Sequence, residues 1–240
     1  MTSPNPKTNL NELQGVVQIS PGNAWAARYV LNGTAYRTLI LHWNGTAWRR
    51  VQSPNTGDAP TDNMLFGIAA HGADDLWAVG QREEGPGTQP LTLHWNGAKW
   101  KIASAPTLGD APFGSFLVDV DIDSMHAWAV GSYAVGRSLK GFILRRDGTK
   151  WKRVQLPSFA LGTVIDRVKA TPHEMSGRSA RRAQRISFCT GTAARGRTFR
   201  SRTPGRCTTS TPSPPTKLDG GGVSQLVGPN LRGPRCTAAS

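Results

Sequence analysis

Cysteine is scarce in this chain of 240 residues and does not occur before position 189. Its three residues, Cys189, Cys207 and Cys236, are an odd number without the spacing of a zinc site, so they predict neither a disulfide framework nor a metal centre. No apolar stretch approaches the length of a membrane span. The N-terminus has no basic region followed by an apolar one, and we therefore expect no signal peptide there.

The residue patterns of several enzyme classes are also missing. There is no G-x-S-x-G nucleophile elbow and no glycine-rich phosphate loop. A copper oxidase of the galactose-oxidase type would need a Tyr–Cys pair, but residues 1–158 contain only Tyr29, Tyr36 and Tyr133 and no Cys. We therefore predict a protein that is not an enzyme and that uses no cofactor or metal.

Tryptophan, in contrast, is frequent and regularly spaced. Its eight residues mark three copies of one repeat: Trp25, Trp43, Trp48, Trp77, Trp95, Trp100, Trp128 and Trp151. Trp25, Trp77 and Trp128 are 52 and 51 residues apart, and the tryptophans that end the three copies keep the same two intervals. A period of about 50 residues that contains several short strands is typical of propeller blades or of a solenoid.

The second copy shows most clearly what one repeat contains. Four short apolar or alternating runs predict its strands: residues 65–70, 76–80, 91–95 and 100–103. Residues 81–90 are rich in Gly and Pro and predict a long loop, and Asn96-Gly97 predicts a tight hairpin turn. Gly45 and Gly148 occupy the same turn in the other copies. Four antiparallel strands of this length indicate a propeller blade.

The predicted fold is therefore all-β, a partial β-propeller of about three four-stranded blades followed by a disordered basic tail. The repeat domain is expected over residues 1–158 and the tail over residues 159–240. The blades are expected at about residues 10–54, 63–106 and 116–158. The first copy starts in the middle of the pattern, just after the place where the last strand of a preceding blade would end.

Three phrases of the repeat resemble a known family. DLWAVG (75–80), TLHWNGAKW (92–100) and VQSPN (51–55) are similar to the tandem β-propeller repeats of large bacterial surface or secreted proteins, of the kelch-like or galactose-oxidase-central-domain-like type. The resemblance covers roughly residues 3–158 and implies a secreted or cell-surface protein. It says little of function, because propellers carry many functions. Such proteins usually have more blades and an export signal.

The segment after the repeats differs in composition. Residues 160–240 hold 14 Lys and Arg against 3 Asp and Glu, without any Trp or Tyr. Such a segment buries too little apolar surface to offset the entropy of ordering, which predicts disorder. The arginine clusters at 177–185 and 195–202 could bind phosphate groups, so nucleic-acid binding is a hypothesis only if this tail is a genuine product.

A fourth blade should begin near residue 159, and residues 164–171 (VIDRVKAT) fit its first strand. The repeat then stops at residues 174–180 (EMSGRSA). Codons that encode this segment can be read one base earlier as DVWAVG, and those of residues 188–196 as LLHWDGSAW in the same frame. We therefore predict that the chain from about residue 172 is an out-of-frame reading of further blades. A genuine disordered tail is the alternative.

The repeated polar and aromatic residues allow two interpretations each. His42 and His94 precede Trp in matching strands, while the third copy has Arg145 there. A metal or catalytic role would need converging partners, so we favour histidines that are hydrogen-bonded within their blades. The tryptophans could form a sugar-stacking platform, but their fixed places favour packing between blades.

The acidic residues also allow two interpretations. Asp119, Asp121 and Asp123 alternate along one strand and resemble part of a calcium site. Calcium needs six or more oxygen ligands and no closing Glu follows, so we favour an exposed acidic strand face. Asp74 and Asp75 precede a strand and are expected in a turn.

These patterns predict a non-enzymatic binding or scaffold module whose ligand, a carbohydrate or a protein, is unknown. We expect the ligand to contact the long loops at 81–90 and 132–141. A glycan-active propeller enzyme is the alternative, but it would need converging carboxylates, and Glu83 and Glu84 are adjacent and should face apart. Three blades would expose two apolar end faces, which predicts self-association.

Overall fold

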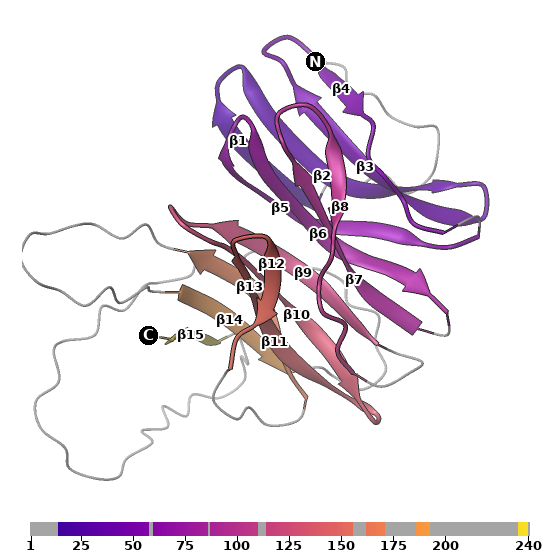
Figure 1. Cartoon of the computed structure of the whole chain (residues 1–240), viewed down its shortest axis with the longest axis vertical. Coiled ribbons are helices and arrows are strands. Elements are labelled where there is room, and N and C mark those ends of the chain that lie inside the picture. The colour runs from indigo at the N-terminus through magenta and orange to yellow at the C-terminus, as the bar shows by residue number, and fades with distance from the viewer. Residues whose placement is uncertain are drawn as a thin grey trace, which may run out of the picture.

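The computed structural model describes residues 14–57, 60–85, 87–109, 114–155, 162–170, 186–192 and 235–239 (Figure 1). These residues form fifteen strands and no helix, so this part of the chain is all-β. Three four-stranded antiparallel sheets and one three-stranded sheet follow one another in chain order. The four-stranded sheets are the blades of a partial propeller.

Each blade is built from four strands that are neighbours in sequence. The first blade contains β1 (Gly15–Ser20), β2 (Asn23–Asn32), β3 (Ala35–Trp43) and β4 (Trp48–Val51). The second blade contains β5 (Asn63–Gly72), β6 (Asp75–Glu84), β7 (Gly87–Trp95) and β8 (Trp100–Ala103). The third blade contains β9 (Ser115–Ile122), β10 (Ala127–Val135), β11 (Ser138–Asp147) and β12 (Lys150–Arg153). The first two sets lie within the ranges that the sequence predicts, and the third begins one residue before its predicted start at 116.

The last hairpin of each blade turns at the predicted glycine. Gly45, Gly97 and Gly148 all have positive φ, at 94°, 86° and 58°. In the first blade, however, four residues separate the paired Trp43 and Trp48, so the turn is longer than the predicted two-residue turn. The side chain of the residue before the glycine explains the length, because Asn44 Oδ1 accepts the backbone N–H of Ala47 at 3.0 Å.

The prediction of long loops at residues 81–90 and 132–141 is wrong, because strands extend into both segments. Strand pairing continues through both segments, as far as Glu84 opposite Gly87 in the second blade. In the third blade it continues to Val135 opposite Ser138. Polar residues, Gly and Pro are compatible with a strand here because these strand ends lie at the solvent-exposed rim. At such a rim, the amino-acid composition of paired strand ends does not differ from that of loops.

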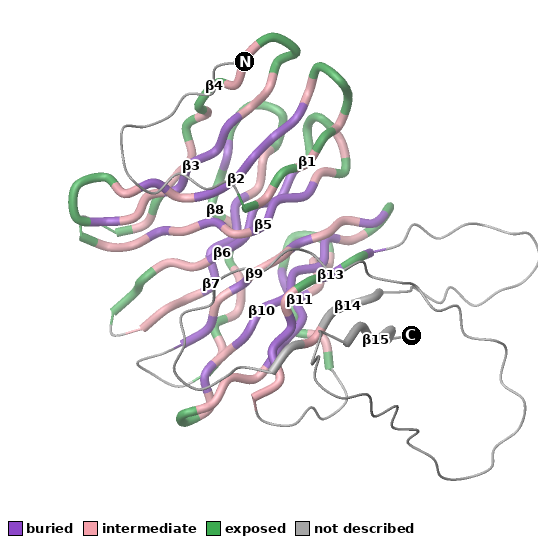
Figure 2. The backbone as a smooth tube through the Cα atoms, turned by 180° about the vertical axis from the view of Figure 1, so that it is seen from behind, coloured by how far each residue is buried: buried purple, intermediate pink, exposed green. Residues whose placement is uncertain are grey.

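Apolar residues from neighbouring blades fill the spaces between the sheets. At the first junction, Trp25 and Ile40 of the first blade pack with residues of the second that include Leu91 and Leu93. At the second junction, Trp77 and Val79 pack with an equivalent set in the third blade. Figure 2 shows the buried positions in the middle of the strands and the exposed ones at the turns.

The fourth sheet comprises β13 (Thr163–Ala170), β14 (Ile186–Thr192) and β15 (Arg235–Ala239). β13 lies where the sequence predicts the first strand of a fourth blade. Its Ile165 and Val168 are buried against Trp128 and Val130 of the third blade, in the position that a further blade would take. The prediction of disorder over 159–240 is therefore wrong for this strand. The arginine clusters at 177–185 and 195–202 lie outside the described residues.

Candidate functional site

The structure places most of the repeated tryptophans inside the molecule. Trp25, Trp77 and Trp128 are each 3% exposed. Trp100 and Trp151 are 4% exposed, so their ring faces do not form an open platform for a sugar. The remaining three are half-buried: Trp43, Trp48 and Trp95. The buried tryptophans thus pack between the sheets, where the large apolar area of indole is removed from water.

At the first junction, Trp25 is the centre of an aromatic cluster. His42 stacks on it at a centroid distance of 4.2 Å and an angle of 27°. Trp95 and Trp100 of the second blade contact the same ring at 5.0 and 5.8 Å. Asn23 Oδ1 accepts the indole N–H of Trp25 and lies 3.0 Å from His42 Nε2. Burial lowers the pKa of His42, which favours the neutral imidazole inside its own blade.

The second junction repeats this cluster with one replacement. His94 stacks on Trp77 at 4.4 Å and 17°, and Trp151 meets Trp77 edge-on at 5.2 Å. The place of Trp95 in the first junction is taken by Arg146, whose guanidinium carbon lies 4.3 Å from the ring centroid of Trp77. A guanidinium on an indole face is a favourable cation–π pair. Arg146 therefore contacts Trp77 without the large aromatic ring that Trp95 provides at the first junction.

A depression of about 530 Å³ opens beside Arg146. It lies between the second and third blades, at the strand ends where β5 turns into β6 and β9 turns into β10. Six of the residues around it carry most of its polar groups: His71, Asp74, Asp75, His94, Asp123 and Arg146. The depression has the size of a small-molecule site and polar groups of several kinds, so it is the candidate binding site.

Hydrogen bonds and charge order the polar groups around the depression. Asp75 Oδ1 lies 2.8 Å from His94 Nε2, and the imidazole is thereby held flat on Trp77. Arg146 Nη1 donates to the carbonyl oxygen of Thr149 at 3.1 Å. Burial lowers the pKa of Arg146, and the charge of Asp75 acts in the opposite direction. Asp75 therefore supports both the imidazole and the cation.

Asp123 has a structural role at the edge of the depression. It is 5% exposed, and its Oδ1 accepts the backbone N–H groups of Met125 and His126, both at 2.7 Å. Its Oδ2 accepts the indole N–H of Trp128 at 2.9 Å. The carboxylate thus fixes the turn that forms one wall of the depression.

The other two residues of the acidic strand connect the third blade to β13. Asp119 Oδ2 accepts the backbone N–H of Val168 at 3.0 Å, and Asp121 Oδ2 accepts that of Ala170 at 2.9 Å. Lys169 Nζ lies 3.1 Å from Asp121. The favoured prediction of an exposed acidic strand face is therefore wrong, because these carboxylates bind backbone groups between sheets. Burial raises the pKa of Asp119 to about 6.

Glu83 and Glu84 lie at the opposite rim, about 30 Å along β6 from Asp75. Glu83 Oε2 accepts the backbone N–H of Asp62 at 3.2 Å, and Glu84 forms an ion pair with Arg82. The two carboxylates thus have separate partners. A second depression of about 430 Å³ lies beside them.

The sequence itself contains a signal for the main site, in a departure of the third copy from the repeat. The phrase LHWNGAKW of the second copy aligns with LRRDGTKW of the third, which sets Arg146 against Trp95. A departure from a repeat at a packing position marks the place where the repeat surface is different. The contact of Arg146 with Trp77 of another blade, however, is evident only in three dimensions.

No protein-family model matches the chain, and no curated protein is similar to it. Within the described ranges, no group of three or more His, Cys, Asp or Glu side chains is arranged to hold a metal ion. The same residues include no helix of the length and hydropathy that would span a membrane.

Proposed function

We propose that this chain is a non-enzymatic binding or scaffold module made of propeller repeats, and that it binds its ligand in the depression beside Arg146. The observation that carries the proposal is the replacement at the second junction. The aromatic cluster of the first junction is complete, whereas the second has a cation and a depression where the indole of Trp95 would be expected. The ligand class is a carbohydrate or a segment of a protein.

The kelch-like family assignment remains part of this proposal. Four-stranded antiparallel blades with one buried Trp in the second strand support it. So does the recurrence of a glycine with positive φ in the last hairpin of all three copies. A location at a bacterial surface follows from the resemblance alone.

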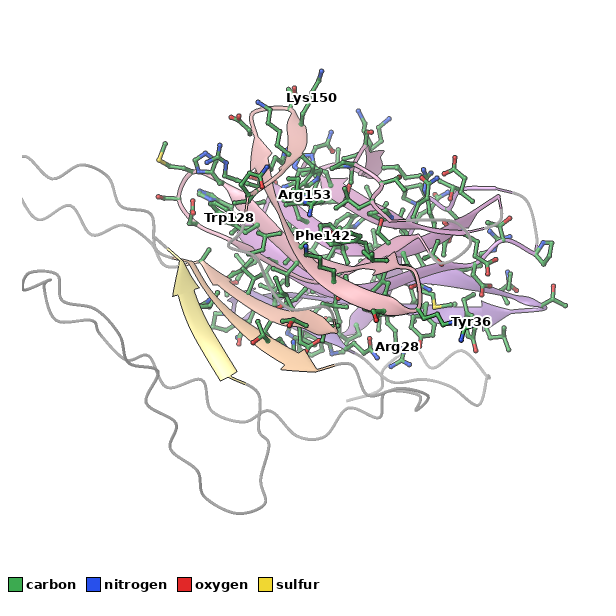
Figure 3. The ribbon with its side chains drawn as sticks, turned by 90° about the horizontal axis from the view of Figure 1, so that it is seen from below. Arg28, Tyr36, Trp128, Phe142, Lys150 and Arg153 are labelled. Atoms are coloured by element: carbon green, nitrogen blue, oxygen red, sulfur yellow. The ribbon has the colours of Figure 1, made fainter. Side chains whose placement is uncertain are left out.

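The variant Arg146→Trp tests the binding proposal. It restores the residue that the second blade has at this position, so the fold should remain while the depression fills. Lys150→Trp is the matched control, since it adds the same side chain at an exposed position of the same hairpin (Figure 3). We expect ligand binding to be lost in Arg146→Trp alone. Binding is measured by titration calorimetry in solution with panels of oligosaccharides and peptides. Equal binding by both variants would refute the site.

A glycan-active enzyme is the second candidate, and one contact favours it. The carboxylate of Asp75 and the imidazole of His94 form a hydrogen-bonded pair in the depression. Such a pair can take up or release a proton next to a bound ligand. Incubation with polysaccharides and an assay for new reducing ends would detect this activity. Absence of the same activity in Asp75→Asn would assign it to this site.

We also propose that the chain beyond about residue 172 is read out of frame. β13 ends at Ala170, four residues before the segment in which the shifted frame would encode DVWAVG. Sequencing the DNA from codon 155 to the stop would test this. A shifted frame that encodes DVWAVG and then LHWDG would support it. A shifted frame without those phrases would leave a genuine basic tail, with nucleic-acid binding as its candidate function.

A further inference from the structure

We infer that the ligand of the depression beside Arg146 is a neutral, polyhydroxylated carbohydrate, bound through Asp75, His94 and Arg146. This inference rests on the proposed binding function and adds the chemical class of the ligand. It depends on the mixture of charges in the lining, on the hydrogen-bonding capacity of its side chains and on the coverage of Trp77.

The charges around the depression are mixed. Asp74 and Asp75 of the second blade and Asp123 of the third carry negative charge, and the guanidinium of Arg146 on β11 carries positive charge. An anionic ligand such as a nucleic acid would be attracted by Arg146 and repelled by three carboxylates. A cationic ligand would meet the reverse. A neutral ligand avoids both repulsions.

The side chains offer acceptors and donors close together. A carboxylate accepts hydrogen bonds only, a guanidinium donates only, and an imidazole does both. Asp75 uses one of its two oxygens, Oδ1, and His94 one of its two ring nitrogens, Nε2, in their mutual hydrogen bond. Hydroxyl groups both donate and accept, so neighbouring hydroxyls of a sugar could bind Asp75 and Arg146 at the same time.

The aromatic surface is closed to a flat ligand. Trp77 is 3% exposed, and His94 and Arg146 both contact its ring. A ligand that binds by stacking on indole would therefore find no face. Met125, 59% exposed at the edge of the depression, offers a small apolar contact for the C–H groups of a sugar ring. Recognition thus has to come from hydrogen bonds to a polar ligand.

Titration calorimetry of the full chain with three sets of probes tests the inference. The neutral set contains cellobiose, maltose, lactose and chitobiose, the anionic set contains oligogalacturonate and a short single-stranded DNA, and the cationic set contains oligolysine. We expect at least one neutral disaccharide to bind. Loss of a hydrogen bond to a charged side chain should weaken that binding by about tenfold or more in Asp75→Asn and Arg146→Trp.

The variants separate the possible results. Lys150→Trp should bind as the natural chain does, and the thermal unfolding of every variant controls for folding. If only charged probes bind and Arg146→Trp prevents it, the carbohydrate class is wrong while the binding site stands. If no probe of any class binds, or if binding does not depend on Arg146, both the carbohydrate inference and the proposed site are overturned.

Discussion

At the scale of single residues, the stacking of a histidine on a buried tryptophan explains why both residue types recur in the first two copies of the repeat. An imidazole lies on a buried indole in the first two blades, and the side chain that starts the strand, Asn23 or Asp75, holds the imidazole. The histidines of the repeat are therefore packing residues in the first blade and both packing and surface residues in the second. The different neighbour of each indole, Trp95 or Arg146, makes one junction closed and the other open.

Trp77→Ala should destabilise the chain strongly. The indole is 3% exposed and contacts His94, Trp151 and Arg146, so its removal leaves a large cavity between two blades. We expect a loss of about 3–5 kcal/mol in the free energy of unfolding, measured by urea denaturation. Trp43→Ala, at a half-buried position, is the control and should cost clearly less. Equal effects of the two changes would contradict the packing described for Trp77.

Asp119→Asn should make stability less dependent on pH. Burial raises the pKa of Asp119 from 3.8 to about 6, opposed by the Val168 N–H and by Arg167. The folded chain thus binds more protons than the unfolded chain between about pH 4 and 6, so this group's contribution to stability falls as pH rises through that window.

Asparagine keeps an acceptor for the Val168 N–H but does not titrate. Unfolding in urea at several pH values should show a flatter profile between pH 4 and 6. At pH 7 the free energy of unfolding of the variant should rise, because the ionised carboxylate is disfavoured in the folded chain. The gain should be on the order of 1 kcal/mol only, since solvent screens a half-buried carboxylate. Asp121, Lys169 and Arg167 remain in the variant and are common to both profiles. An unchanged profile would show that Asp119 does not titrate in this window.

At the scale of strands and hairpins, the glycine that ends the phrase LWAVG permits close contact within a blade. A Cβ on Gly80 would lie 2.0 Å from the carbonyl oxygen of Met64 and 2.8 Å from Leu65 Cα. The register of β5 against β6 shifts at this place, between Leu65 and Gly67. Gly131 has the same contacts with β9 in the third blade. The recurrence of glycine in the phrase therefore has a steric reason.

Gly80→Ala should separate β5 from β6 at the irregular pair. Because the nearest atoms belong to the backbone, they cannot move aside without a shift of the strand, and we expect a loss of at least about 1–3 kcal/mol. Gly72→Ala in the same strand pair is the matched control, since a Cβ there would meet nothing within 4 Å. Thermal unfolding of the two variants gives the comparison. A neutral Gly80→Ala would mean that the strands are farther apart than described.

At the scale of the whole molecule, the blades stack in series and each buries its face against the next. Val16 in β1 is 60% exposed, whereas the equivalent Ile68 and Val120 are 7% and 4% exposed between blades. We expect the face of the first blade that carries Val16 to cause self-association. Light scattering would detect it as an average molecular mass that rises with protein concentration. Val16→Asp should reduce it. A single monomer mass at all concentrations would contradict the expectation.

Much of this architecture follows from local signals. The Trp spacing predicts three blades, and alternation with Asn96-Gly97 predicts the last hairpin of the second blade. The extension of β6 and β7 through residues 81–90 escaped prediction because exposed strand ends and loops share a composition. The bonds of Asp119 to β13 and the contact of Arg146 with Trp77 escaped it because both join residues far apart in the chain.

The most direct test of the account compares the two equivalent indoles, Trp25 and Trp77, in one NMR titration. The indole N–H signals are followed while the tightest-binding neutral disaccharide is added to the full chain. We predict a shift of the Trp77 signal, because Trp77 lies under Arg146 at the depression, and no shift of the Trp25 signal, because Trp95 closes the junction of Trp25. A shift of Trp25 alone, or of neither residue under saturating ligand, would contradict it.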